Sequence, residues 1–217
     1  MVKFILTLFV SVICLSACQT VEYNGTDYLK QGIDAYQRND YRRAANLWNK
    51  ACDKGAANAC GRLGLMHTQG KGVPQNYNQS ARLFEKSCDG GIALSCALLA
   101  IHYWQGKGVP QDYTQSAKLF EISCNNDVAW GCAALGALYE KGKGVAQNQT
   151  QATKLYEKSC QGGFAAACDY PAYLAKNNQS KKNKMTQKKS TQSFDPLSNT
   201  LLHNKNTLQR LGIDISQ

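Results

Sequence analysis

The sequence predicts an all-α fold, a solenoid of stacked helix pairs that repeats every 36 residues. Eight of the ten cysteines form four pairs with members eight residues apart, and each pair follows the last by 36. A Gly-Lys-Gly-Val motif recurs with the same period, at 70–73, 106–109 and 142–145. The intervening segments are rich in Ala and Leu and lack the alternation typical of strands. The pairs are Cys52 and Cys60, Cys88 and Cys96, Cys124 and Cys132, and Cys160 and Cys168.

The first segment, residues 1–17, has the pattern of a lipoprotein signal peptide. Lys3 supplies a positive charge, and residues 4–13 form an apolar stretch that is short for a membrane span. The sequence Leu-Ser-Ala-Cys at 15–18 resembles a bacterial lipobox, in which the cysteine is acylated and becomes the new N-terminus. The alternative is an ordinary secretory signal cleaved nearby. Both interpretations predict export to a compartment where disulfides form.

We therefore expect an exported bacterial lipoprotein that is attached to the membrane by a lipid on Cys18. Gln19 follows the cysteine, and the absence of Asp there resembles the sorting signal of outer-membrane lipoproteins. Residues 18–26 are expected to be a lipidated terminus and a short linker. The expected location is the outer membrane, facing the periplasm or the cell surface, with secretion as a further alternative.

The solenoid is expected to span residues 27–176, with about four and a half units of two helices each. The Gly-Lys-Gly-Val-Pro loop ends the first helix of a unit, because Gly accepts the left-handed cap and Pro cannot continue a helix. The first unit has a shorter turn at 38–40. The predicted helices lie near 27–38, 41–54, 58–69, 77–89, 93–105, 113–125, 129–141, 149–161 and 165–175.

The paired cysteines are expected to form four local disulfides. Eight residues along one unbroken helix span about 12 Å, which is beyond disulfide reach. A turn between the two cysteines brings the last turn of one helix opposite the first turn of the next. Zinc is the alternative, but it needs four converging ligands, whereas successive pairs lie in successive repeats about 10 Å apart.

The chain resembles the Sel-one-like repeats, which are relatives of the tetratricopeptide repeat. The resemblance covers residues 27–175, where the cysteines, Gly-Lys-Gly-Val and a Leu-Phe-Glu motif at 83–85 and 119–121 repeat in phase. The cysteine spacing is similar to that of the Helicobacter cysteine-rich protein family. The resemblance implies a right-handed α/α superhelix with one disulfide per hairpin. It also implies two functions, a binding scaffold and a penicillin-binding protein with weak β-lactamase activity.

The residues themselves do not indicate an enzyme. The Ser-x-x-Lys motif of serine β-lactamases is absent from the sequence. A metal-dependent β-lactamase needs clustered histidines, and the three here, His67, His102 and His203, lie at positions that the repeat does not relate. We therefore expect no catalytic residue, no metal and no cofactor. The possibility of β-lactamase activity depends on the family resemblance alone.

The concave face of the superhelix is the expected binding surface. Bulky residues near the ends of the first helices are candidates to hold a peptide or glycan, with packing between repeats as the alternative. The loop lysines line one edge and are candidates to contact an acidic ligand. Their Gly-Lys-Gly loops lack the strand and the Ser or Thr of a phosphate-binding loop. The candidate residues are His67, Tyr103, Trp104, Tyr139, Lys71, Lys107 and Lys143.

The C-terminal segment, residues 177–217, is a basic tail that is expected to be disordered, with a short helix possible near its end. The net charge of the whole chain is +10, and five lysines lie between Lys181 and Lys189. A solubilising role and attraction to an anionic envelope polymer are the two interpretations. A nucleic-acid partner is not expected for an exported lipoprotein.

Taken together, these features predict a monomeric, exported scaffold that binds proteins, peptides or envelope components through its superhelical face. The second hypothesis is a penicillin-binding protein with weak β-lactamase activity. The third is a secreted or surface effector that acts on host proteins. No motif in the sequence identifies the partner.

Overall fold

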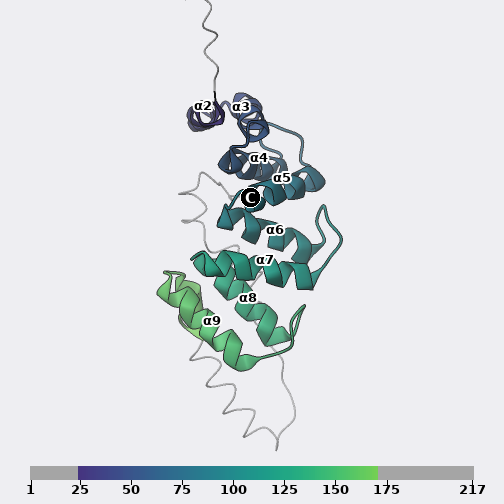
Figure 1. The fold of residues 1–217 in the computed structure, drawn as a ribbon, viewed down its shortest axis with the longest axis vertical. Coiled ribbons are helices and arrows are strands. Elements are labelled where there is room, and N and C mark those ends of the chain that lie inside the picture. The colour runs from purple at the N-terminus through teal and green to yellow at the C-terminus, as the bar shows by residue number, and fades with distance from the viewer. Residues whose placement is uncertain (1–23, 171–217) are drawn as a thin grey trace, which may run out of the picture.

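The computed structural model describes residues 24–170, which form a stack of antiparallel helices (Figure 1). These residues contain eight α-helices of 13 residues each, one short 3-10 helix and no strand. The signal peptide, Cys18 and the basic tail lie outside the described residues. In chain order the elements are α2 (Gly25–Gln37), α3 (Tyr41–Asp53), α4 (Ala57–Gln69), α5 (Tyr77–Asp89), α6 (Ala93–Gln105), α7 (Tyr113–Asn125), α8 (Ala129–Lys141), α9 (Gln149–Gln161) and η1 (Ala165–Ala167).

The prediction of an all-α solenoid is confirmed, and the first eight predicted helices agree with the structure to within two residues at each end. The ninth was expected over residues 165–175, but the structure has a single 3-10 turn at Ala165–Ala167. Pro171 has no N–H to donate to the carbonyl oxygen of Ala167, which disfavours one continuous α-helix from residue 165 onward. A turn at 168–169 separates the 3-10 helix from Tyr170, which is helical again. Residues 171–175 lie beyond the described part of the chain.

Each repeat consists of a first helix and a second helix. The first helices are α2, α4, α6 and α8, and the second helices are α3, α5, α7 and α9. The closest packing is within these pairs, and each second helix also packs against the first helix of the next repeat. Figure 1 shows the repeats following one another along the long axis of the molecule.

An aromatic side chain on each second helix fills the centre of each repeat. These residues are 36 positions apart and at most 2% exposed, and small residues of the first helices lie against them. A Cβ atom on Gly64 would lie 3.0 Å from the ring of Phe84, so glycine is needed for this close approach. The aromatic residues are Trp48, Phe84, Phe120 and Tyr156.

The loop between the helices of a repeat closes onto the preceding repeat. Gly106 ends α6 in the left-handed conformation with φ of 67°, as the sequence predicted. Gly108 has φ of 74°, and a Cβ atom there would lie only 2.2 Å from the carbonyl group of Tyr77 at the start of α5. Gln111 donates from Nε2 to the carbonyl oxygen of Trp104 at 2.8 Å and holds the loop against α6. The glycine-rich motif is therefore a docking element between repeats.

All four predicted disulfides are present, with Cα–Cα distances of 4.5 to 4.8 Å. Each joins the last turn of a second helix to the chain that follows, which in the first three cases is the first turn of the next first helix. The zinc alternative is overturned, because a bonded sulfur cannot act as a thiolate ligand. The pairs are Cys52–Cys60, Cys88–Cys96, Cys124–Cys132 and Cys160–Cys168.

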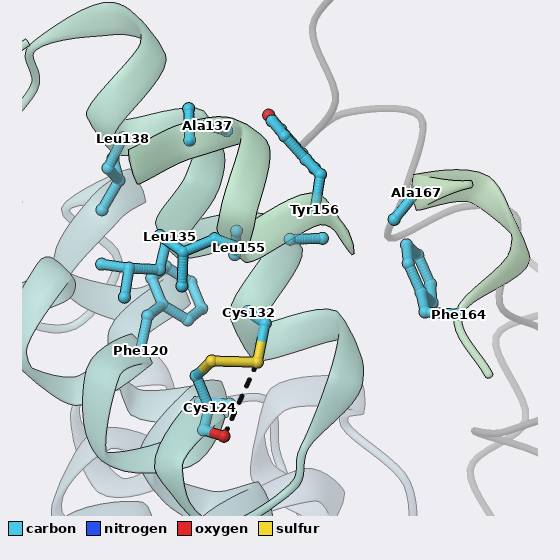
Figure 2. Close-up of a cluster of buried hydrophobic side chains, with 14 of the residues drawn as sticks. Phe120, Cys124, Cys132, Leu135, Ala137, Leu138, Leu155, Tyr156, Phe164 and Ala167 are labelled. Atoms are coloured by element: carbon cyan, nitrogen blue, oxygen red, sulfur yellow. Dashed lines mark hydrogen bonds between the residues drawn. A yellow bond between two sulfur atoms is a disulfide. The ribbon is translucent and has the colours of Figure 1, made fainter. Parts of the chain in front are cut away.

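The third disulfide lies inside the largest apolar cluster of the described chain (Figure 2). Cys124 and Cys132 are each 1% exposed, and Phe120, Leu135 and Leu155 belong to the same cluster. The sulfur of Cys132 lies 3.6 Å from the carbonyl oxygen of Cys124, and since a bonded sulfur carries no proton this is a close contact. The covalent link and the core therefore hold the same pair of helices together.

Across residues 24–170, no helix has the length and apolar character that a membrane span requires.

Candidate binding face of the first helices

The two sets of helices differ in the surface that they present. The second helices α5, α7 and α9 expose charged side chains along their length. The first helix α6 has no Asp, Glu, Lys or Arg, α4 has only Arg62, and α8 has Glu140 and Lys141 in its last turn. The first helix α2 differs, because it carries Asp27, Lys30 and Asp34. The sparsely charged face formed by α4, α6 and α8 is the one that offers apolar area to a partner. The exposed charges of the second helices are Arg82, Glu85, Lys86, Asp89, Lys118, Glu121, Lys154, Glu157 and Lys158.

A surface pocket lies on this face between the first helices α4 and α6, and we call it the first-helix groove. On α4 its residues are spaced three and four apart, which places them on one side of the helix. The α6 wall begins at the N-cap residue Ile92 and continues one turn beyond Leu94 to Leu98. Most of these side chains are half-buried. The lining residues are Asn58, Gly61, Arg62, Leu65, Ile92, Leu94, Ser95 and Leu98.

The floor of the groove is built from small residues. Ser95 accepts or donates a 2.7 Å hydrogen bond with Ser87 of α5, and both hydroxyls are buried. A Cβ atom on Gly61 would lie 2.7 Å from the Ser95 hydroxyl oxygen. Gly61 therefore allows α4 to approach α6 closely, and the larger side chains Arg62, Leu65 and Leu98 form the walls.

Arg62 is the single charged residue of the groove. Its guanidinium lies 5.6 Å from the centre of the Trp48 ring, a cation–π contact that fixes one side of the group. Burial lowers the pKa of Arg62, while the nearby Tyr36 acts in the opposite direction, and the side chain stays charged at neutral pH. Within residues 24–170 it has no ion pair and no hydrogen bond. A half-buried positive charge thus stands in an apolar groove without a counter-ion.

The predicted aromatic candidates are mostly used in packing. Tyr103 is half-buried against the cluster of Ala81, Phe84 and Leu99, and Tyr139 is half-buried against the largest cluster. Trp104 also packs against that largest cluster, and its indole nitrogen has no hydrogen-bond acceptor among the described residues. None of the three lines the first-helix groove.

His67 lies at the C-terminal end of α4, close to the loop that follows. Its Nδ1 is 3.3 Å from the carbonyl oxygen of Pro74, so the ring helps to close the Gly-Lys-Gly-Val-Pro loop. The backbone N–H of Asn76 donates to the carbonyl oxygen of His67 at 2.9 Å in the same turn. This candidate therefore also lies outside the groove, at a position that supports the fold.

The three candidate lysines each lie over a tyrosine ring of the preceding repeat. Lys107 Nζ is 5.4 Å from the centre of the Tyr77 ring, and Lys143 Nζ is 4.9 Å from that of Tyr113. Each tyrosine is the first residue of a second helix. The lysines therefore join successive repeats, and none of them lines the groove.

Lys71 makes the most extensive of these contacts. Its Nζ lies 4.2 Å from the centre of the Tyr41 ring and donates to the Tyr36 hydroxyl at 3.3 Å. Burial lowers the pKa of Lys71, but its contacts with the Tyr36 and Tyr41 hydroxyls outweigh burial and raise the pKa above its usual value. The position of this lysine is therefore set by the two tyrosines.

His102 is a buried histidine whose role the sequence did not show. It is 5% exposed, its Nδ1 is 2.7 Å from the Lys107 carbonyl oxygen, and its Nε2 is 3.4 Å from Ser80 Oγ. Because the carbonyl oxygen only accepts, Nδ1 of the neutral ring carries the proton and Nε2 accepts from Ser80. Burial lowers the pKa of His102, with the hydrogen bond to the Lys107 carbonyl acting the other way.

The Ser80–His102 contact has the residue types of a nucleophile and a base, but it cannot serve as one. Ser80 is fully buried, so no substrate reaches its hydroxyl. Its Oγ is also 2.6 Å from Thr68 Oγ1, which completes a hydrogen-bonded chain between α4, α5 and α6. Among the described residues there is also no cluster of His, Cys, Asp and Glu that would hold a metal ion.

The fold and the paired helices define an α-solenoid repeat protein. The family model for the Sel1 repeat matches the chain four times, at residues 25–55, 57–92, 93–128 and 131–164. Because these matches cover more than half of the chain, the protein belongs to the Sel1-repeat family. Their boundaries place Cys52 and Cys60 in successive repeats, so the disulfides link one repeat to the next.

One similar protein is from Helicobacter pylori and is named "Putative beta-lactamase HcpD". It is 34% identical over 74 residues, which cover 34% of this chain and 24% of HcpD. The matched region is thus about a quarter of the length of that relative. The predicted resemblance to Sel-one-like repeats and to the Helicobacter cysteine-rich proteins is confirmed by these matches.

Two solved structures are also similar. The first is c5321, a protective antigen present in uropathogenic Escherichia coli strains with a Sel1-like repeat fold. It is 26% identical, with a TM-score of 0.68, and the match covers 71% of this chain and 34% of c5321. The second is Helicobacter pylori cysteine rich protein B, which is 29% identical with a TM-score of 0.49 over 60% of this chain and 94% of the other.

Proposed function

We propose that this protein is a disulfide-stapled scaffold that binds a protein or peptide through its first-helix face. The observation that carries the proposal is the first-helix groove, where apolar side chains surround Arg62, whose charge has no counter-ion among residues 24–170. The second helices offer a dense mixture of exposed charges instead. Repeat solenoids commonly bind partners along one extended face, and the family membership agrees with that role.

The scaffold is proposed to act outside the cytoplasm. Four disulfides in one short repeat array require an oxidising compartment. The signal-peptide pattern of residues 1–17 and a lipid on Cys18 would place it at the outer membrane, facing the periplasm or the cell surface. In that setting Lys181–Lys189 would attract an anionic envelope polymer, and a surface-exposed or secreted form would meet host proteins.

The binding proposal is tested by crosslinking in intact envelopes followed by recovery of the protein. Leu98→Asp places a charge on the α6 wall of the groove, and we expect the crosslinked partner to be lost. Lys118→Asp changes an exposed residue on the second helix α7 and serves as the control. Equal recovery of the partner by both folded variants would contradict a binding site in the groove.

The alternative function is weak β-lactamase activity, and the name of HcpD is what favours it. The shared region is only 24% of HcpD, and the serine–histidine pair in this fold is inaccessible. A nitrocefin assay on purified, oxidised protein separates the two functions. Turnover that persists through purification and disappears in a folded first-helix variant would establish the enzyme and refute a pure scaffold.

A further inference from the structure

The first-helix groove has a chemistry that narrows the kind of partner, and this inference rests on the proposed function. Arg62 is the only charged residue among the eight that line it. The other walls are Leu65, Leu94, Leu98 and Ile92, which are apolar. A ligand that fills this groove must bury apolar surface and at the same time meet a cation.

Arg62 is held in place, but no residue in the described part of the chain pairs with its charge. The Trp48 ring occupies one face of the guanidinium at 5.6 Å, and no carboxylate of residues 24–170 pairs with it. Its N–H donors are therefore available to a planar, bidentate acceptor, for which a carboxylate is the best geometric match. Partial burial strengthens such a pair, because solvent screens it less than it would screen an exposed pair.

Arg62 distinguishes the α4–α6 groove from the grooves that follow it in the array. The positions equivalent to Arg62 in the next two repeats are Leu98 and Ala134, which lie 36 and 72 residues further on. Position 58 is Asn in the first groove, and its equivalents are Leu94 and Trp130. In the preceding repeat, whose turn is shorter, the equivalent position on α2 is the exposed Lys30. The cation at this position is therefore lost after α4, and the continuation of the face along α6 and α8 is apolar.

We propose that the first-helix groove binds a peptide segment in which an aliphatic side chain lies directly beside a carboxylate. The carboxylate pairs with Arg62, and the aliphatic side chain fills the space between Leu65 and Leu98. An Asp or Glu side chain and a free C-terminus both supply the required group, so the experiment separates these two sources.

The test is affinity selection of synthetic random dodecapeptides on purified, oxidised protein. One library has free C-termini and the other is amidated, and enriched peptides are resynthesised with Asp and Glu changed to Asn and Gln. We expect enriched peptides to carry Leu, Ile or Val next to an acidic residue or the C-terminal carboxylate. Neutralising that group should weaken binding about tenfold or more.

Matched variants locate the contact. Arg62→Gln should remove the difference between acidic and neutral peptides, whereas Arg82→Gln, which changes the net charge equally at an exposed site on α5, should leave it intact. This control matters because the chain carries +10 overall and attracts acidic peptides without specificity. Circular dichroism and a count of free thiols confirm that both variants are folded and oxidised.

The outcomes separate this inference from the proposed function. The inference is overturned if peptides shift the backbone NMR signals of α4 and α6 but show no preference for an acidic group. It is also overturned if they show such a preference and Arg62→Gln leaves it unchanged. In both cases the proposed scaffold function still holds. Failure to enrich any peptide that contacts the first helices overturns both. If Arg62→Gln loses the preference for acidic peptides and Arg82→Gln keeps it, the result supports both the inference and the scaffold function.

Discussion

At the scale of single residues, several positions have roles that only their neighbours explain. Gly108 combines a positive φ of 74° with a contact that leaves no room for a Cβ atom. Gly91 also has a positive φ, of 84°, but nothing lies within 4 Å of a Cβ atom there. These two glycines separate the cost of backbone conformation from the cost of a steric clash.

Gly108→Ala is therefore expected to destabilise more than Gly91→Ala. The left-handed conformation costs an alanine about 1–2 kcal/mol, and at Gly108 the clash with the Tyr77 carbonyl adds about 1–3 kcal/mol. Urea unfolding followed by circular dichroism, with disulfides intact, measures both. Equal losses of unfolding free energy would show that the loop does not dock on α5 as tightly as the structure indicates.

His102 predicts a dependence of stability on pH. Its pKa is lowered by burial, below the unfolded value of 6.5. The unfolded chain therefore binds a proton before the folded chain does, so the contribution of His102 is fully present above about pH 6.5 and is lost as the pH falls towards the folded pKa. The contribution of His102 to the slope of unfolding free energy against pH is at most about 1.4 kcal/mol per pH unit.

His102→Asn should remove this slope. Unfolding free energies measured between pH 7.5 and 5 would show a smaller decrease for the variant than for the wild type, even if the variant is less stable throughout. A wild-type decrease that the variant reproduces in full would assign the effect to other groups.

At the scale of elements, each disulfide ties a second helix to the chain that follows it. Loss of Cys88–Cys96 by a double change to Ala should cost about 2–3 kcal/mol, because it closes a short loop. It lies in the middle of the array, so its loss should also weaken the coupling between repeats and lower the denaturant m value.

The matched control is the double change of Cys160 and Cys168, the last disulfide of the described chain. It joins α9 to the segment at η1, which has no further first helix among the described residues. We expect a similar loss of stability with an unchanged m value. If the two double variants had the same m value, the repeats would not depend on the central disulfide for cooperative unfolding.

The elements were predictable from the sequence because their markers repeat in phase. Cysteine pairs, glycine caps and aromatic residues recur every 36 positions, so one local argument placed eight helices and four disulfides. The prediction failed at the C-terminal end of the described array, where a ninth helix was expected over residues 165–175. In place of the start of the ninth predicted helix, the structure has a 3-10 helix at Ala165–Ala167 and a turn at 168–169. The prediction from the cysteine pattern did not take into account that a proline at 171 disfavours a continuous helix.

The candidate site was less predictable, because its contacts join different repeats. The ring under Lys107 belongs to Tyr77, 30 residues earlier, and helix periodicity does not show this pairing. Arg62 was missed because a cation at this position does not recur in the two repeats that follow, where the equivalents are Leu98 and Ala134. Comparison of the repeats within the chain could have found this change. Residues that repeat every 36 positions predict the fold, whereas residues that differ between repeats, such as Arg62, indicate where a partner binds.

At the scale of the whole molecule, we propose an exported scaffold that is anchored by a lipid on Cys18. Its anchor is tested by Cys18→Ser. We expect the wild type to incorporate a radiolabelled fatty acid and to fractionate with the outer membrane, and the variant to lose the label because it has no thiol to acylate. A labelled Cys18→Ser variant would place the lipid elsewhere, and an unlabelled wild type would favour an ordinary secretory signal.

We propose that the partner of this scaffold binds in the groove between α4 and α6. A photoactivatable amino acid at Leu98 in the groove, compared with one at Lys118 on α7, tests it directly in living cells. We expect a discrete crosslinked product from position 98 that Arg62→Gln diminishes, and none from position 118. A product from position 118 in the absence of one from position 98 would contradict it.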